Sequence, residues 1–583
     1  MVTKFQELQE HLTVRISQIR GVPEHELPAT ITALLQHTIQ HIYSPKLQRI
    51  INTPEAALRA AEDSKMPGQA SVYIPASDDI GFNIWFDFAK ALPAQILNVK
   101  KIDIPLDDKT ADEMSKSAGF LSLAHEQNAD GNHILLPYVV PGGRFNEIYG
   151  WDTNFIAMGL LIEGNVTLVR SLIKHHLAEI QMYGRVLNAN RCYYLTRSQP
   201  PLFIDLVLSY ADHLSAEEFV REKALIESCI KAGIQEYEAM WTAEPHQTKN
   251  GLSRYFDPRK HFPPETEPGH FDPVIKPYAD KLGISIEAYM QAFNAGEIEN
   301  SELADFVMHD GAVRESGHDT TNALIGKAAH LNVVCLNSFL GKAEADIACL
   351  IESYFGGSLH IKNRITTAEE WRKKFEHRKQ LMDQFLWNEK CGYFEDYDFI
   401  KGAFSAYISP RGLFPLWAGL ASQQQADRIV STLLPALEFP GGLASSDESS
   451  RGPVTLEHPQ RQWDYPAGWA PHQILAWKGL ERYGYHEEAQ RLIYKWLFMI
   501  TTTWLHTRTI VEKYDVVTSS QDFHAEYGNV GQGMDLHESA GFGWTNASYE
   551  IGLARLDSSY RDKLDRLISP DVVFDRSKNR DFY

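Results

Sequence analysis

Carboxylates, arginines and tryptophans recur in five short stretches of the sequence that also contain glycine or proline. This mixture is typical of sugar binding, because aromatic faces cover the C–H patches of a pyranose while carboxylate, guanidinium and amide groups hold its hydroxyls. Hydrolysis of a glycosidic bond further needs two carboxyl groups, one to protonate the leaving oxygen and one to activate water. Taken singly, each acidic residue could equally be a helix cap or a surface charge. The stretches span residues 141–152, 197–201, 315–321, 462–471 and 541–548.

Each of these stretches precedes a segment in which apolar residues have helical spacing, for example at 155–156 with 160–161. Strand-like alternation is weak along the chain, so we predict an all-α protein. If the helices surround a common axis, their N-terminal ends share one rim and the five stretches line one pocket. An (α/α) barrel builds a site in this way, and loops on a rigid scaffold commonly carry binding and catalysis.

The sequence contains no linker of domain-boundary type, which favours one continuous structural unit. Within it we predict a mainly helical N-terminal segment over residues 1–110, packed on a catalytic domain over 111–583. Two further stretches, 242–275 and 436–453, are rich in proline, glycine and acidic residues and should be loops. Either could cover a pocket or be a plain surface excursion.

The charge balance excludes several classes of partner. The 583 residues include 56 Lys and Arg against 76 Asp and Glu, a net charge of −20, which repels nucleic acid and anionic membranes. The five cysteines are scattered, so free thiols in a reducing compartment are expected. No signal-peptide pattern opens the chain, and no apolar run reaches the roughly 18 residues of a membrane span. We therefore predict a cytoplasmic protein that acts on a neutral small molecule. The sequence does not encode its oligomeric state in a readable motif, and we expect a monomer.

Other common chemistries lack their signatures. HExxH is absent, and His175 and His176 are adjacent, so on a helix they face different directions and favour structural roles over metal binding. The glycines of residues 528–533 are not followed by GK[ST], and no GxSxG elbow occurs. We expect neither a metal nor a cofactor.

Two long motifs narrow the assignment. The segments PGGRFNEIYGWD at 141–152 and QWDYPAGWAP at 462–471 resemble the two signature motifs of the trehalases, glycoside hydrolase family 37. The resemblance runs from about residue 73 to about 555 and is greatest to the catalytic core of fungal neutral trehalases. Further matching segments, in the same order as in that family, are NANRCYYLTRSQPP (188–201), PPETE (263–267), VRESGHDTT (313–321), EKYDV (512–516), AEYGN (525–529) and GFGWTNASY (541–549).

The resemblance implies an (α/α)6 barrel, a six-hairpin toroid, that hydrolyses α,α-trehalose to two glucose molecules with inversion. Asp319 takes the position of the family's general acid, and Glu512 that of the general base. Asp319 must stay protonated near neutral pH, which desolvation or a nearby carboxylate such as Glu315 could achieve by raising its pKa. An inverting site separates its two carboxyl groups by roughly 6.5–9.5 Å, to leave room for the attacking water.

The resemblance also assigns the residues that hold the sugar. The arginines among them would clamp hydroxyls with forked donors, and the glycine would let the backbone approach the substrate closely. The tryptophans Trp151, Trp463 and Trp544 could instead be plain core aromatics. The predicted sugar contacts are Arg144, Phe145, Trp151, Asp152, Asn188, Arg197, Ser198, Gln199, Glu265, Arg314, Gly317, Trp463 and Glu526.

Two positions depart from the family pattern. Asn154 stands where the first motif usually has an aromatic residue, and Asn322–Ala323 replace a common Tyr-Arg. Because they neighbour Asp152 and Asp319, hydrolysis of another small α-glucoside is a second hypothesis. A non-catalytic sugar sensor is a third, disfavoured by the presence of both an acid and a base. Residues 1–72 contain no DxDxNG-type calcium loop, and we predict for them only helical packing on the barrel.

Overall fold

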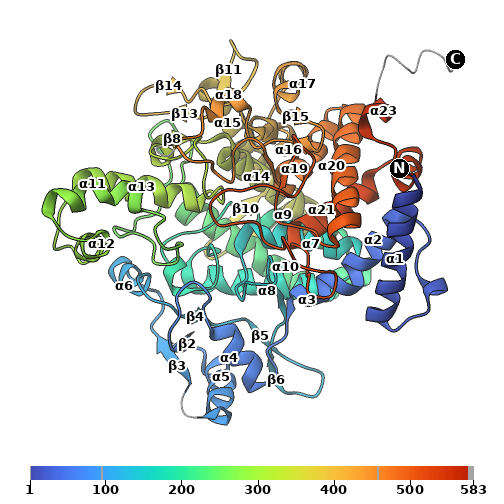
Figure 1. The fold of residues 1–583 in the computed structure, drawn as a ribbon. Helices are drawn as coiled ribbons and strands as arrows, with labels where there is room; N and C mark the ends of the chain where they lie inside the picture. The colour runs from blue at the N-terminus through green and yellow to red at the C-terminus, as the bar shows by residue number, and fades with distance from the viewer. Residues whose placement is uncertain (1, 94–95, 456–457, 575–583) are drawn as a thin grey trace.

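Six helices form a closed ring in the computed structural model, which describes residues 2–93, 96–455 and 458–574 (Figure 1). Each ring helix contacts the next, and the last returns to the first, so the (α/α)6 prediction is confirmed. The ring is formed, in order, by α7 (Gly150–Ile162), α9 (Phe203–Asp212), α14 (Val334–Phe355), α16 (Phe414–Ala418), α19 (Ala470–Arg482) and α21 (Gly543–Arg555).

Ring helices are buried on nearly all sides, whereas outer helices keep one polar face. All twelve residues from Gly150 to Leu161 of α7 are buried, as expected for a helix enclosed by neighbours. Outer helix α10 instead begins in solvent with a capping box between Ser215 and Glu218. The outer layer consists of α8 (Val166–Tyr183), α10 (Ala216–Glu236), α15 (Ala368–Phe385), α17 (Gln423–Leu437), α20 (His486–Thr507) and α22 (Ser558–Asp565).

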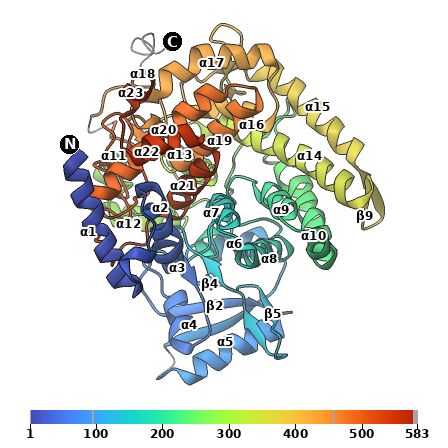
Figure 2. The same cartoon turned by 90° about the vertical axis from the view of Figure 1, so that its right-hand side faces the viewer.

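The N-terminal segment is only partly helical. It also contains a three-stranded parallel sheet, in the order β3-β2-β4, which lies with α5 outside the barrel (Figures 1 and 2). Because β4 lies beyond residue 110, the sheet spans the boundary predicted there, and that division of the chain stays a prediction. The elements are α1 (Val2–Arg20), α2 (Ile31–Thr38), α3 (Ser44–Leu47), α4 (Pro54–Ala61), β2 (Ala70–Pro75), α5 (Asp79–Ala91), β3 (Leu97–Ile102), α6 (Asp108–Met114) and β4 (Phe120–Leu121).

Short antiparallel ladders fasten the loops between the helices. The ladder β17–β18 places residues 467–468 beside residues 514–515, and so joins the second long motif to the segment that carries Glu512. The paired strands are β1 (Gln48–Arg49) with β7 (Tyr138–Val139), β5 (His125–Gln127) with β6 (His133–Leu135), β9 (Ser358–Ile361) with β10 (Arg364–Thr367), β11 (Trp387–Asn388) with β12 (Tyr393–Phe394), β13 (Tyr397–Asp398) with β8 (Leu331–Asn332) and β14 (Ala403–Phe404), β15 (Glu438–Phe439) with β16 (Gly442–Leu443), and β17 (Ala467–Gly468) with β18 (Tyr514–Asp515).

A helical excursion precedes the predicted acid. Helices α11 (Asp272–Leu282), α12 (Ile286–Asn294) and α13 (Ser301–Glu315) bury a small apolar cluster of their own, separate from the main core. Of the two predicted loops, 242–275 reaches the pocket described below through residues 265–268. The other, 436–453, folds into β15, β16 and the short helix α18 (Glu448–Arg451), and contributes no residue to that pocket. Helix α23 (Pro570–Phe574) follows α22.

Candidate active site

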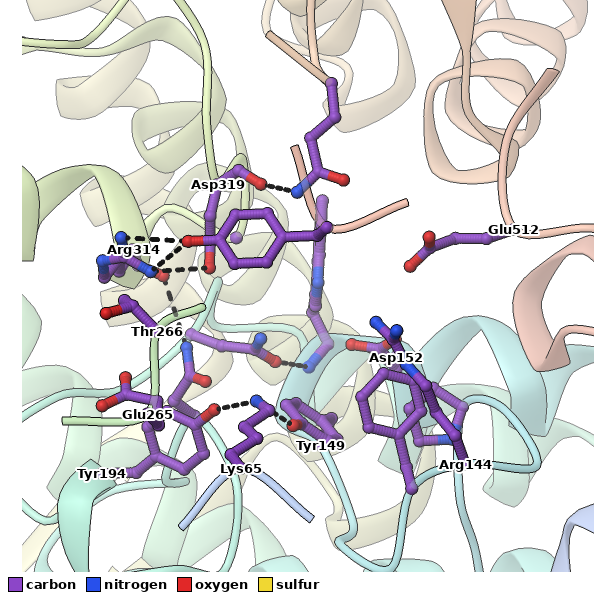
Figure 3. Close-up of a pocket in the computed structure, with 18 of the residues that line it drawn as sticks. Lys65, Arg144, Tyr149, Asp152, Tyr194, Glu265, Thr266, Arg314, Asp319 and Glu512 are labelled. Carbon is purple, nitrogen blue, oxygen red and sulfur yellow. Dashed lines mark hydrogen bonds and ion pairs between the residues drawn. The ribbon is translucent and has the colours of Figure 1, made fainter. Parts of the chain in front are cut away.

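A cavity of about 390 Å³ lies among the loops that precede the ring helices. This volume suits a small ligand such as a disaccharide. All but two of the sequence-predicted site residues line it, and Figure 3 shows how part of this set converges. The predicted residues in the lining are Arg144, Phe145, Trp151, Asp152, Asn188, Arg197, Gln199, Glu265, Arg314, Gly317, Asp319, Trp463 and Glu512.

Ser198 and Glu526 lie outside this lining. Ser198 is fully buried, and its hydroxyl donates to the carbonyl of Val186 at 2.5 Å, so it braces the loop behind the pocket. Glu526 accepts a hydrogen bond from the Thr320 hydroxyl and faces Arg461 at 3.5 Å. Burial raises the pKa of Glu526 to about 7, although Arg461 opposes the shift.

The first motif is held to the segment that follows helix α8 by backbone and side-chain hydrogen bonds. The amide of Gly150 donates to the Asn188 carbonyl at 3.2 Å, and the Trp151 amide donates to Oε1 of Gln199 at 2.9 Å. These bonds satisfy amides at the start of α7 that have no partner inside the helix. They also fix Trp151 and Asp152, in the first turn, relative to Gln199.

Four tryptophans form an aromatic wall. Trp463 and Trp469 stack with ring centroids 3.9 Å apart, and Trp151 lies 5.7 Å from both Trp463 and Trp544. Each of the four is almost fully buried, yet each also lines the cavity. The core and the sugar-binding interpretations of these residues are therefore compatible, since each ring packs in the core and also borders the cavity.

Asp319 lies at the border of the cavity. Its side chain remains 32% exposed toward the cavity, and Oδ2 lies 3.9 Å from Nη1 of Arg314. Burial raises the pKa of Asp319 above its ordinary value, and the charges of Arg314 and Arg197 only partly oppose this. The side-chain amide of Gln462 donates to the Asp319 carbonyl and anchors the segment.

Glu315 does not have the effect on Asp319 that the sequence suggested. It is fully buried, accepts hydrogen bonds from the amides of Ser198 at 3.2 Å and Phe256 at 2.8 Å, and faces His246 at 3.1 Å. The carboxylate whose charge helps to raise the pKa of Asp319 is Asp310, after burial as the main cause. Glu315 therefore has a structural role: it binds the backbone at Ser198 and Phe256 and the side chain of His246.

Glu512 reaches the cavity from another direction. Its carboxylate is 13% exposed and pairs with Nζ of the fully buried Lys513 at 2.8 Å. Lys513 also donates to the Gly528 carbonyl at 2.5 Å, so the ammonium is fixed by the fold. The Trp544 indole donates to the Glu512 carbonyl at 3.4 Å, which ties the segment to the start of α21. In Figure 3, Glu512 lies across the cavity from Arg314 and Glu265.

Asp152 lies within electrostatic reach of both carboxyl groups. Burial raises its pKa well above the ordinary value, and the charges of Glu512 and Asp319 raise it further. Three carboxyl groups with different surroundings therefore meet in one cavity. Different environments for neighbouring carboxyl groups are the physical basis for dividing acid and base tasks among them.

Several lining residues were not predicted. Tyr149 and Tyr194 stand inside the recognised motifs, so their aromatic, hydroxyl-bearing side chains were a usable signal. Lys65 had no such signal, because it comes from the N-terminal segment for which only packing was predicted. The unpredicted lining also includes Thr266, Gln462, Trp469, Tyr527 and Phe542.

The two departures from the family pattern lie outside the cavity lining. Asn154 is buried behind it, and its amide donates to Oδ2 of Asp205 at 3.3 Å. The Asn322 backbone amide donates to Oδ2 of Asp464 at 3.0 Å. Neither side chain is therefore placed to select among sugars.

The described residues also bear on metal binding and on membrane insertion. Within 2–93, 96–455 and 458–574, no group of three or more His, Cys, Asp or Glu side chains is arranged to hold a metal ion. None of the helices in these same ranges combines the length and apolar character that crossing a membrane requires.

An (α/α)6 barrel whose cavity joins three carboxyl groups with arginines and a tryptophan wall defines a glycoside hydrolase. The sequence model of the trehalase family matches residues 23–557. The cytosolic neutral trehalase of Saccharomyces cerevisiae is 39% identical over 540 residues, covering 90% of this chain and 72% of the yeast protein. A probable trehalase of Eremothecium gossypii is 40% identical over 559 residues, or 93% and 76% of the two chains.

A solved structure agrees with these sequence relationships. The neutral trehalase Nth1 from Saccharomyces cerevisiae superposes with a TM-score of 0.86 at 36% identity, covering 94% of this chain and 98% of that one. The chain belongs to the trehalase family, and it is a hydrolase that cleaves trehalose to glucose.

Proposed function

We propose that this chain hydrolyses α,α-trehalose with inversion, with Asp319 as the general acid and Glu512 as the general base. The observation that carries the proposal is the contrast between the two carboxyl groups in one cavity. Burial raises the pKa of Asp319, which favours the protonated form that an acid needs. Glu512 instead faces the ammonium of Lys513 at 2.8 Å, a partner that suits a carboxylate anion.

The proposed reaction has one displacement step. Asp319 gives its proton to the glycosidic oxygen as the bond from that oxygen to the anomeric carbon breaks. A water molecule forms the new bond to the same carbon from the opposite face, and its proton passes to Glu512. The products are the leaving glucose, which keeps its α configuration, and a second glucose in the β configuration.

The surrounding groups would bind the two sugars. The guanidinium groups of Arg144, Arg197 and Arg314 supply several donors each for hydroxyl oxygens, and the tryptophan wall covers apolar sugar faces. Burial raises the pKa of Asp152, and its carboxyl group lines the same cavity, where it can hydrogen-bond a sugar hydroxyl.

The stereochemical outcome tests this mechanism. Proton NMR of freshly cleaved α,α-trehalose, recorded before mutarotation, should show one α-glucose and one β-glucose in equal amounts. Finding only the α anomer at early times would indicate retention and overturn the role given to Glu512. A structure with a bound analogue should place the two carboxyl groups roughly 6.5–9.5 Å apart.

A preference for another small α-glucoside is the alternative, and it rested on Asn154 and Asn322. Both side chains lie outside the cavity lining, which favours trehalose. Substrate profiling decides between the two: the alternative holds if another α-linked disaccharide is cleaved with a higher kcat/KM than trehalose. We also infer that the protein is a monomer and that it is located in the cytosol. Light scattering tests the oligomeric state. The location is supported by relatives described as cytosolic neutral trehalases.

A further inference from the structure

Lys65 brings a cation from the N-terminal segment into the catalytic cavity. Its ammonium donates to the hydroxyl oxygens of Tyr149 at 3.1 Å and Tyr194 at 2.9 Å. It also lies 5.6 to 5.9 Å from the ring centroids of these tyrosines and of Phe145. Figure 3 shows the ammonium between the two phenol groups. Such a cage of two hydroxyls and three rings orients a lysine far better than a solvated surface does.

The backbone that carries Lys65 is built for this placement. The fully buried Arg191 donates to the three carbonyls of residues 60–62, at 2.7 to 3.1 Å, and so anchors the end of α4. Asp63 then accepts hydrogen bonds from the amides of Lys65 at 2.8 Å and Met66 at 3.1 Å. Arg191 belongs to the same motif as Tyr194, so one segment of the barrel fixes both ends of the contact.

The ammonium belongs to a chain of charges on one side of the cavity. Tyr194, which accepts from Lys65, lies under the guanidinium of Arg197, with 4.6 Å from Cζ to the ring centroid. Arg197 pairs with Glu265 at 2.7 Å, and both are buried. The charge of Lys65 acts on Glu265 and on Asp319, and in each case it lowers the pKa. Lys65 itself keeps a raised pKa, because Tyr194 and Glu147 outweigh the lowering effect of burial.

This side of the cavity is the one away from the base. In Figure 3, Lys65, Tyr194 and Glu265 gather on one side, and Glu512 stands on the other. During inversion, water activated by the base attacks the anomeric carbon from the face opposite to the leaving oxygen. The sugar attached to that oxygen therefore lies on the far side from Glu512, next to Lys65 and its tyrosines.

We propose that Lys65 is a positioning residue for the leaving glucose. It orients the hydroxyl groups of Tyr149 and Tyr194 toward that sugar. A phenol oxygen that accepts a hydrogen bond from an ammonium keeps its own hydrogen for a further acceptor. The donation also polarises the phenol, which strengthens the bond it makes to a sugar hydroxyl. The inference rests on the proposed roles of Asp319 and Glu512, since these define which sugar leaves.

The experiment compares two substrates in Lys65→Met. For α,α-trehalose, kcat/KM should fall about tenfold or more, as expected when a charge-assisted hydrogen-bond network is lost. In α-glucosyl fluoride the leaving group is fluoride, so no sugar occupies the position of the leaving glucose. For this substrate the loss of kcat/KM should be at least several-fold smaller. Lys100→Met is the matched control, because Lys100 donates to the Tyr73 hydroxyl at 3.4 Å outside the cavity. It should leave both substrates unaffected.

A second readout separates positioning from general damage. Removing the Lys65 charge takes away a group that lowers the pKa of Asp319, so the alkaline limb of the kcat/KM profile should move to higher pH. If Lys65→Met does not fold, Tyr194→Phe removes one accepting hydroxyl, keeps the ring, and should show the same difference between substrates. In the folded variant, unchanged trehalose kinetics, or equal losses on both substrates with an unmoved pH limb, would overturn the inference.

These results are distinguishable from failure of the proposed mechanism. If Asp319→Asn retains wild-type turnover, the assignment of acid and base is wrong, whatever Lys65→Met shows. If Asp319→Asn and Glu512→Gln are inactive while Lys65→Met behaves as wild type on trehalose, the mechanism stands and only the role of Lys65 is rejected.

Discussion

Gly317 lies against the indole of Trp151, so closely that a Cβ atom on the glycine would come within 2.7 Å of Cε2 of the ring. The backbone of Gly317 also has φ +73°, in the left-handed region that side chains disfavour. Both residues line the cavity. In the sequence, Gly317 is two residues before Asp319, the predicted acid, and Trp151 directly precedes Asp152. The absence of a side chain at 317 thus determines where Trp151 can lie.

Gly317→Ala should therefore reduce both stability and activity. The left-handed backbone costs about 1 kcal/mol for a residue with a Cβ atom, and displacement of the Trp151 ring should lower kcat/KM by about tenfold or more. Gly164→Ala is the control: its φ is +78°, but no atom lies within 4 Å of the added Cβ. In thermal unfolding it should lose only the part of the stability that the left-handed backbone costs, and it should keep wild-type kinetics. Wild-type activity in Gly317→Ala would contradict the argument.

Asp319→Asn and Glu512→Gln should each fold normally and lose turnover by about 10² to 10⁴-fold, the usual contribution of a general acid or base. Each replacement keeps the size of the side chain and removes its ability to exchange a proton. Circular dichroism checks the fold, and glucose release from trehalose checks the activity. Asp522→Asn, at an exposed position outside the cavity lining, serves as the control and should remain active.

The two roles can be separated with a small anion. In Glu512→Ala, the space of the lost carboxylate should admit azide, which attacks the anomeric carbon without deprotonation and yields β-glucosyl azide from trehalose. Azide cannot replace a proton donor, so Asp319→Ala should not be rescued in this way. Mass spectrometry and NMR of the products provide the measurement. An α-glucosyl azide from Glu512→Ala would reject inversion at this site.

The helical part of the fold was readable from the sequence, and the parallel sheet was not. The residues that begin α7 and α21 follow glycine-containing loops and carry apolar side chains at helical spacing. Strand β2, by contrast, is only six residues long. Its apolar residues Ala70, Val72 and Ile74 do alternate with Ser71, Tyr73 and Pro75, but so short a run is a weak signal beside the long helical patterns.

The site shows the same contrast: residues inside local motifs could be predicted from the sequence, and a residue defined by long-range contacts could not. Asp319 and Glu512 stand in motifs whose order could be recognised, and both reach the cavity. Lys65 could not be found from the sequence, because its contacts are long-range. Its partners Tyr149 and Tyr194 follow it by 84 and 129 positions in the chain. The charge acting on Asp319 was likewise assigned to the nearby Glu315, although the helical turn of α13 places Asp310 there instead.

Asn322→Ala should leave the kinetics on trehalose within about twofold of wild type, because substitutions that break no specific interaction change free energies by only a few tenths of a kcal/mol. Its backbone amide, which the substitution retains, makes the contact to Asp464. Gln462→Ala is the contrasting amide replacement: Gln462 lines the cavity and donates to the Asp319 carbonyl, so its loss should reduce kcat/KM. A changed sugar preference in Asn322→Ala would revive the alternative specificity.

The contact between the N-terminal segment and the barrel should make stability depend on pH. Glu550 of α21 is fully buried, and its Oε2 accepts from the amides of Gln36 at 2.6 Å and Gln40 at 3.4 Å. Burial raises the pKa of Glu550 to about 7; Gln36 opposes the shift, and the charge of Glu163 adds to it. Burial also raises the pKa of Glu163 to about 7.

The sign of the effect follows from proton binding. Between the unfolded pKa of 4.5 and the folded pKa of about 7, the folded protein holds a proton on Glu550 that the unfolded chain releases. The free energy of unfolding therefore falls as pH rises through this window, by about 3 kcal/mol for Glu550 alone. Glu550→Gln, which cannot ionise, should be more stable than wild type at pH 8 and similar to it near pH 4.5. Urea unfolding at both pH values measures this difference. The control is Glu299→Gln, at an exposed position, which should show no such difference. A difference for Glu550→Gln that does not change with pH would contradict the prediction.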